Sequence, residues 1–299
     1  MTVETPVGSR LRNFKRSAKV TLYRTSTPLF EEEFEVDRKD NGIEITDLRI
    51  EFNVKRDLSK HPNSCSIKIT NLGKAARTAL SKKPLNVVLE AGYDGVTRVL
   101  YTGDMIFGMS TLDDADWTTL IQCGDGDRVN ASARINRSYP SGTPVKDILK
   151  DLAKSMGQVL PSSVLNSKEL DTQVQGYSAY GSSAEQLSRL LVPHGYSHSL
   201  QNGKLQIIKE SETTGGTRDE YLLDEAAGII GSPEFGSPPR SGKPPHVTVN
   251  MLLYPELRPG ARAHVRSLAI NSSFKIESVS HSGDTHGQAW TTSVELKPL

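Results

Sequence analysis

The sequence predicts a mainly β protein that carries an α+β insertion. In both end regions, apolar and polar residues alternate with a period of two, which is typical of half-buried strands. Helical spacing of apolar residues is confined to the middle of the chain. Aromatic residues make up 6% of the 299 residues and hydrophobic residues 36%. The cores are therefore expected to be thin and built from strands.

The first strand-rich region is predicted at 19–130. Residues 50–55 and 65–70 show the clearest alternation, so each is expected to form a half-buried strand. A short polar helix or turn at 73–80 separates them from further strands. Residues 93–95 (Tyr-Asp-Gly) predict a hairpin turn, because glycine tolerates the positive φ that such turns require.

The middle region combines helices with a hairpin. Pro144 can occupy the first position of one helix, where its missing N–H costs nothing. A second helix is expected to begin at Ser182, with Glu185 completing a capping box. The Asn-Gly pair at 202–203 then predicts a hairpin.

Strands resume after a proline-rich stretch and run through 247–251, 261–266 and 290–296. The chain is therefore predicted to divide into an N-terminal arm (1–18), a first β domain (19–130), an α+β module (131–230), a Pro/Gly-rich linker (231–245) and a second β domain (246–299), which can also take in strands from the middle region.

The two strand-rich regions end alike. In each, a polar acidic loop precedes Trp-Thr-Thr and a long strand, at 117–119 and again at 290–292. This shared order predicts a duplicated β domain with the α+β module inserted between the copies. A trimer of such chains would present six similar units around one axis.

Charge and cysteine content exclude several protein classes. The formal net charge is +1, which does not favour a dedicated nucleic-acid binder. Cys65 and Cys123 are expected to be free buried thiols. No apolar run approaches the roughly 18 residues of a membrane helix, and no signal peptide opens the chain. We therefore expect a soluble protein without stable membrane insertion or an export signal of its own. An acid-free basic stretch is expected to be a solvated or frayed arm: Arg10, Arg12, Lys15, Arg16 and Lys19.

Two acidic or histidine-rich segments could in principle bind metal. His281, Asp284 and His286 lie close in sequence, but a fourth ligand such as His264 is not assured, so a polar turn with exposed histidines is predicted. The aspartates of the other segment do not follow the EF-hand pattern, which predicts solvated hairpin tips: Asp113, Asp114, Asp116, Asp125 and Asp127. No metal, cofactor or catalytic residue is predicted, and no phosphate-binding loop or nucleophile elbow occurs.

Arg262, His264 and Arg266 share one face of a predicted strand. That face is a candidate lumen lining or subunit interface. Alternation alone supports a solvated face equally well.

Several segments resemble the baseplate hub proteins of contractile phage tails and related injection systems. The resemblance rests on their order and spacing: 48–54, 62–72, 89–95, 101–104, 255–260 and 279–284. It implies two tube-like antiparallel β-barrel domains per chain, flanking the α+β module. It also implies a homotrimer whose six barrels continue the lumen of a hexameric tail tube, with a trimeric central spike below. The family supplies no catalytic residues to carry over.

The predicted function is accordingly that of a structural hub subunit in the virion, assembled in the host cytoplasm. Its expected partners are the tail tube and central spike proteins, with baseplate wedge or tape-measure proteins as further candidates. DNA is expected to pass through the lumen without specific binding. Two alternatives remain open: a tail-associated cell-wall hydrolase with its site in the middle module (131–224), and a carbohydrate- or receptor-binding tail module that uses Trp- and Tyr-bearing loops.

Overall fold

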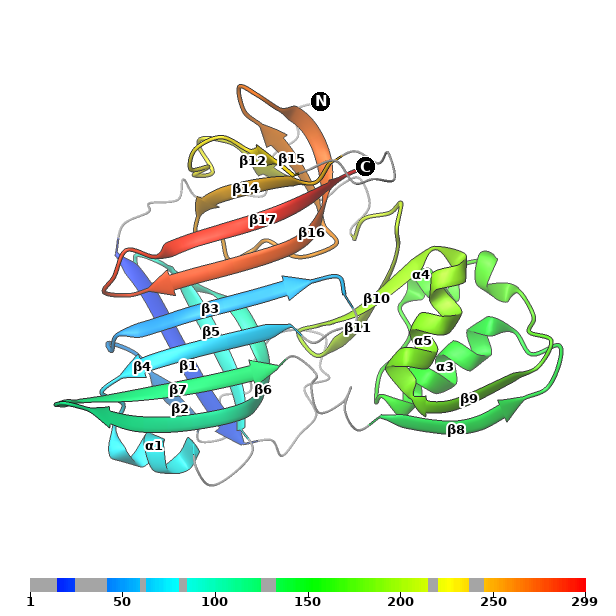
Figure 1. Cartoon of the computed structure of the whole chain (residues 1–299), viewed down its shortest axis with the longest axis horizontal. Helices are drawn as coiled ribbons and strands as arrows, with labels where there is room; N and C mark the ends of the chain where they lie inside the picture. The colour runs from blue at the N-terminus through cyan, green and yellow to red at the C-terminus, as the bar shows by residue number, and fades with distance from the viewer. Residues whose placement is uncertain are drawn as a thin grey trace.

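The computed structural model describes residues 15–24, 42–59, 63–80, 85–124, 133–214, 220–236 and 245–299. Most of these residues lie in strands, and all the helices except a short one at Lys74–Leu80 gather in a small module at one side (Figure 1). The predicted class, mainly β with an α+β insertion, is confirmed. No helix in this part of the chain has the length and apolar character needed to cross a membrane.

The described residues of the first strand-rich part form seven strands and one short helix. They are β1 (Arg16–Arg24), β2 (Ile43–Ile45), β3 (Ile50–Asp57), β4 (Ser64–Thr70), α1 (Lys74–Leu80), β5 (Leu85–Tyr93), β6 (Val96–Asp113) and β7 (Asp116–Gly124). Ile50, Phe52 and Val54 are buried on one face of β3, as the alternation predicts. Asp94 and Gly95 both have positive φ (51° and 78°), which forms the predicted β5–β6 turn.

The middle module has a core of its own, built by both helices and strands. Its elements are β8 (Arg134–Tyr139), α3 (Val145–Ser155), α4 (Ser162–Leu165), η1 (Glu169–Asp171), β9 (Tyr177–Ser182), α5 (Ser183–Leu191), η2 (Val192–His194), β10 (Tyr196–Gln201) and β11 (Lys204–Lys209). The predicted capping box is not formed, because Ser182 makes no side-chain cap hydrogen bond. Ser182 is instead the last residue of β9, which leads directly into α5.

In the second strand-rich part, the structure describes six strands. They are β12 (Glu220–Leu223), β13 (Glu234–Phe235), β14 (Val247–Leu252), β15 (Arg262–Arg266), β16 (Asn271–Asp284) and β17 (Trp290–Pro298). Two of these elements differ from expectation. The short strand β13 lies within the predicted linker, and β16 extends through His281 to Asp284, where a polar loop was predicted.

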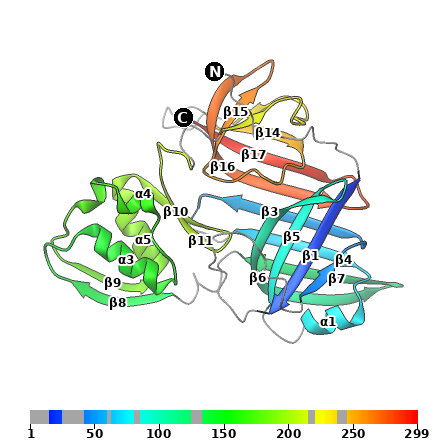
Figure 2. The same ribbon diagram turned by 180° about the vertical axis from the view of Figure 1, so that it is seen from behind.

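Both strand-rich parts belong to one 13-stranded sheet, because β16 pairs antiparallel with β3. Figure 1 shows β16 and β3 side by side at the boundary between the two parts. Figure 2 shows β1 and β5 crossing the opposite side of the first part, so the sheet folds over its own core. The second part encloses a separate core.

The strands of the two parts follow the same order. The first is arranged β3-β4-β7-β6-β5-β1, and the second β13-β14-β17-β16-β15-β12. Corresponding neighbours pair antiparallel in both, except that β1 is antiparallel to β5 whereas β12 is parallel to β15.

Candidate assembly interface

The junction between the two parts is a continuous ladder. It runs from the pair Ser278–Asp57 to the pair Asp284–Glu51. At Gly283, a Cβ would lie 2.2 Å from Cζ of Phe52, so only glycine fits beneath this ring. The close approach explains a glycine in the middle of a paired strand.

Trp290 inserts from the second part into the core of the first. Its ring meets those of Phe52 and Tyr93 edge-on, at centroid distances of 5.4 and 6.4 Å, and the side chain is buried. Trp117, its counterpart in the repeated triplet, is only partly buried and lies 3.8 Å below the guanidinium of Arg77. Both tryptophans open a strand as predicted, but only Trp290 connects the two parts.

Charged and polar contacts surround this junction. Arg49 Nη2 lies 2.8 Å from Asp284 Oδ2, and its hydrogen bond holds the pKa of that carboxyl at about 2. Arg16 donates to the carbonyl of Gln288 at 3.1 Å. Thr285 Oγ1 accepts from the Ile50 amide at 3.0 Å. These contacts fix the loop after β16 against the first part.

Arg16 is exposed, but it lies on β1 and is not part of a frayed arm. Lys19 also lies on β1 and forms a 2.6 Å ion pair with Glu90 on β5. Arg10 and Arg12 fall outside the described residues.

The prediction of an exposed turn at 281–286 is wrong for the first part of this segment, which belongs to β16. His281 is fully buried, and burial, together with the cations Arg56 and Arg258, lowers its pKa to about 3. Its Nδ1 hydrogen-bonds with Thr292 Oγ1 at 2.9 Å. His286 is exposed. The described residues contain no cluster of three histidine, cysteine or acidic side chains that could hold a metal.

The acidic segment at 113–116 forms the exposed β6–β7 tip, as predicted. Asp116 accepts from Asn71 Nδ2 at 2.8 Å, whereas Asp125 and Asp127 lie outside the described residues. Cys65 and Cys123 are free and buried as predicted, and they lie opposite each other on β4 and β7.

Arg262, His264 and Arg266 do share one face of β15, and each has a partner. Arg262 pairs with Glu220 at 2.9 Å, and Arg266 pairs with Asp224 at 2.5 Å. His264 lies 2.9 Å from Asn271 Oδ1 through Nε2 and 3.1 Å from Ser273 Oγ through Nδ1. The two arginine charges are thus balanced locally by carboxylates.

The α+β module attaches to the first part through Gln201. Its Nε2 donates to the carbonyl of Asp57 at 2.7 Å. Its Oε1 accepts from Arg56 at 3.3 Å and from Asn63 at 3.1 Å. Arg56 is 1% exposed, so this amide satisfies part of a buried cation.

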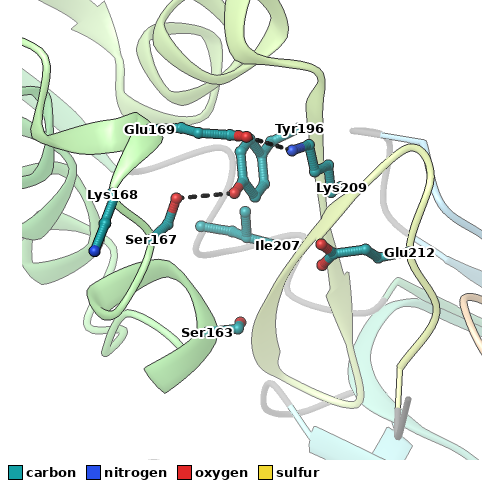
Figure 3. A pocket seen from close by; sticks show the side chains of 8 residues that line it. All are labelled: Ser163, Ser167, Lys168, Glu169, Tyr196, Ile207, Lys209 and Glu212. Atoms are coloured by element: carbon teal, nitrogen blue, oxygen red, sulfur yellow. Dashed lines mark hydrogen bonds and ion pairs between the residues drawn. The ribbon is translucent and has the colours of Figure 1, made fainter. Parts of the chain in front are cut away.

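A shallow pocket lies in the module between α4, η1 and the β10–β11 hairpin (Figure 3). Glu169 forms a 2.6 Å ion pair with Lys209, and Ser167 hydrogen-bonds with the Tyr196 hydroxyl at 3.0 Å. A general acid or base needs a carboxyl free to reach its substrate. The pairing with Lys209 therefore disfavours Glu169, but not Glu212 in the same pocket, as a general acid or base.

Comparison with protein families gives one match, to the model described as baseplate hub gp41, over residues 30–295. No curated protein matches the chain significantly. Among solved structures, the 43 kDa tail protein of prophage MuSo2 from Shewanella oneidensis is similar, with a TM-score of 0.64 and 11% identity over 94% of this chain and 97% of that one. A tail protein from Neisseria meningitidis MC58 has a TM-score of 0.59 and 13% identity over 94% and 96% of the two chains. The type VI secretion component c3393 of E. coli, described as structurally similar to the T4 tail proteins gp27 and gp5, has a TM-score of 0.56 and 11% identity over 85% and 74%.

Proposed function

Since the chain belongs to the baseplate hub gp41 family, and is thus a structural component of a phage tail baseplate, we propose that it forms a trimeric, pseudo-hexameric ring. This ring joins the hexameric tail tube to the trimeric central spike and surrounds the channel for DNA ejection. The chain acts in the virion through its interfaces and carries out no catalysis. Its assembly takes place in the host cytoplasm.

One observation supports this proposal most directly: the two strand-rich parts repeat one strand order and are fused into a single sheet. Two equivalent domains in each of three chains supply six equivalent units, which matches six-fold and three-fold partners at once. We therefore interpret the chain as a duplicated β domain, at 19–130 and at 246–299 together with β12 and β13 from the middle region, with the α+β module inserted between the copies.

The face of β15 that carries Arg262, His264 and Arg266 is the candidate lumen lining or subunit interface. A conduit for DNA must not bind phosphates strongly, because affinity rises with every phosphate that a free cation neutralises. Ion pairs with Glu220 and Asp224 reduce that attraction. The local charge balance is thus compatible with passage of DNA without specific binding.

Measuring the mass of the complex tests the proposal. The chain has a mass of 32.7 kDa, so three copies give about 98 kDa (3 × 32.7). We expect this mass in solution or after addition of the spike protein, and a six-fold ring with a central channel in electron micrographs of tails. A chain that stays monomeric with both tube and spike proteins would contradict the proposal.

A further inference from the structure

The long strands β6 and β16 have the same internal plan. Each carries a bulge in its pairing with the next strand, between Met105 and Phe107 in β6 and between Ile276 and Ser278 in β16. In both strands, pairing with the preceding strand ends immediately before the bulged segment. The last residue paired with β5 is Asp104, and the last residue paired with β15 is Lys275. Five residues after the end of the bulge, each strand pairs with the tryptophan of the repeated triplet. Leu112, counted from Phe107, lies opposite Trp117, and Gly283, counted from Ser278, lies opposite Trp290.

Beyond the bulge, the two strands differ in one respect. The outer edge of β16 is occupied, because Ser278–Asp284 pairs with β3. The corresponding segment of β6, Phe107–Asp113, pairs with β7 on one side and with no described strand on the other. An unpaired strand edge is a template for another strand.

The exposure of side chains follows this difference. Ser278 is 6% exposed beside β3, whereas its counterpart Phe107 is 43% exposed. Met109 and Leu112 are 49% and 57% exposed on the same segment. The open edge is thus the more apolar of the two, which is the opposite of what a permanently solvated hairpin favours.

The strand order identifies the element that would fill this edge. In the order of strands across the sheet, β3 is the first strand of the first part and β13 the first strand of the second. Each pairs antiparallel with its neighbour, β3 with β4 and β13 with β14. The pairing registers of the two parts can be aligned residue by residue. In the first part, successive paired residues are Asn53, Ser66, Gln122 and Phe107, and in the second they are Glu234, Thr248, Glu295 and Ser278. Glu234 therefore corresponds to Asn53, and Ser278 corresponds to Phe107. β13 lies at the end of the sheet, and Phe235 on it is 61% exposed.

We propose that the distal edge of β6, at Ser110 and Thr111, pairs antiparallel with β13 (Glu234–Phe235) of a second copy of this chain, at the place where β16 pairs with β3 within one chain. Carrying over the internal pair Asn53–Ser282 places Glu234 of one copy opposite Thr111 of the next. The inference rests on the proposed ring and specifies its contacts. Internal and external junctions then alternate head to tail, which is the arrangement that closes a ring.

Cysteine cross-linking of the full chain tests this register. In the double variant Thr111→Cys/Glu234→Cys, mild oxidation with copper phenanthroline should shift the chain on a non-reducing gel to the sizes of two and three copies. Both positions are exposed. Cys65 and Cys123 are buried, and burial raises the pKa of the Cys65 thiol, so they should contribute little background.

Two controls use competing edges. Thr111→Cys alone would cross-link if two β6 edges met across a two-fold axis. Thr111→Cys/Glu44→Cys would cross-link if the partner were β2, the strand at the other end of the sheet. Cross-linking of Thr111→Cys alone overturns the inference, and so does cross-linking of the β2 variant in place of the double variant. If the double variant forms trimers by mass and still does not cross-link, the inference fails while the ring stands. A chain that stays monomeric even with the tube and spike proteins present overturns both.

A charge on the edge gives an independent measurement. Met109→Lys should shift the mass distribution from trimer towards monomer. Val96→Lys is the matched control, because Val96 is also exposed, at 61%, but lies on the half of β6 that already pairs with β5. An equal effect of both variants on assembly would contradict a role for the distal edge.

Discussion

Individual side chains connect the two halves of this hub protein. Trp290 is supplied by the second half but buried in the first, and its indole N–H has no protein partner among the described residues. The side chain therefore stabilises the first core by packing against Phe52 and Tyr93 and not by hydrogen bonding.

Asp284 makes the junction sensitive to acid. Its hydrogen bond from Arg49 lowers its pKa from 3.8 to about 2. A carboxyl with a depressed pKa in the folded state stabilises the fold above its ordinary pKa, and this contribution is lost as the pH falls from about 4 towards 2. The free energy of urea unfolding should thus fall less on acidification in Asp284→Asn than in the unmodified chain.

Asp94→Asn is the matched control for that measurement. Asp94 lies at the exposed β5–β6 turn, where asparagine also tolerates a positive φ. This variant should keep the acid sensitivity of the unmodified chain. If both variants lose it equally, Asp284 is not its source.

The element that unites the molecule is the β3–β16 ladder, and Gly283 is its most sensitive position. Gly283→Ala places a methyl group against Phe52, whose ring is held by Trp290 and is 4% exposed. Overpacking of this kind costs about 1–3 kcal/mol in the free energy of unfolding. Gly73→Ala is the control, because no atom lies within 4 Å of a Cβ there and the change should be nearly neutral. Equal stabilities in denaturant would show that Phe52 can move aside.

Sequence patterns predicted most of the strands but not their partners. The alternation at 50–55 gave β3, and the Asn-Gly pair gave the β10–β11 hairpin, because both signals are local. The pairing of β3 with β16 joins residues more than two hundred positions apart, and no local pattern encodes which edge meets which. The pair β8–β9 was missed because most residues of β8 are exposed, so that it lacks a regular apolar face.

The same limit applies to the candidate interface. Arg262, His264 and Arg266 were correctly placed on one strand face, since alternation determines faces. The junction residues Arg49 and Asp284 carry no such pattern. The repeated Trp-Thr-Thr triplet was the one sequence signal near them, and it marked Trp290 without showing which core Trp290 enters.

At the scale of the whole molecule, the α+β module is a separate body held by a few polar contacts. Gln201→Ala removes the amide that bridges Asp57, Asn63 and buried Arg56. Arg56 keeps its bond to the Leu100 carbonyl and Asn63 its bond to the Leu200 carbonyl, so the change removes one hydrogen bond from each. A hydrogen bond of this kind contributes about 0.5–1.5 kcal/mol to the free energy of unfolding. Hydrogen exchange should accelerate in β10 and β11, where the attachment lies. Gln175→Ala changes an exposed glutamine elsewhere on the module and should leave exchange unaltered; similar acceleration in both variants would contradict a bridging role.

The insertion of Trp290 into the first core also determines when that core can be completed during synthesis. Residues 15–124 leave the ribosome long before β16 and β17, so the nascent first half has an open β3 edge and a gap where the indole belongs. Contacts of such long sequence separation form late, and exposed strand edges are prone to wrong pairing in the meantime. A ribosome that stalls before residue 290 therefore releases a first half that lacks the indole of its own core.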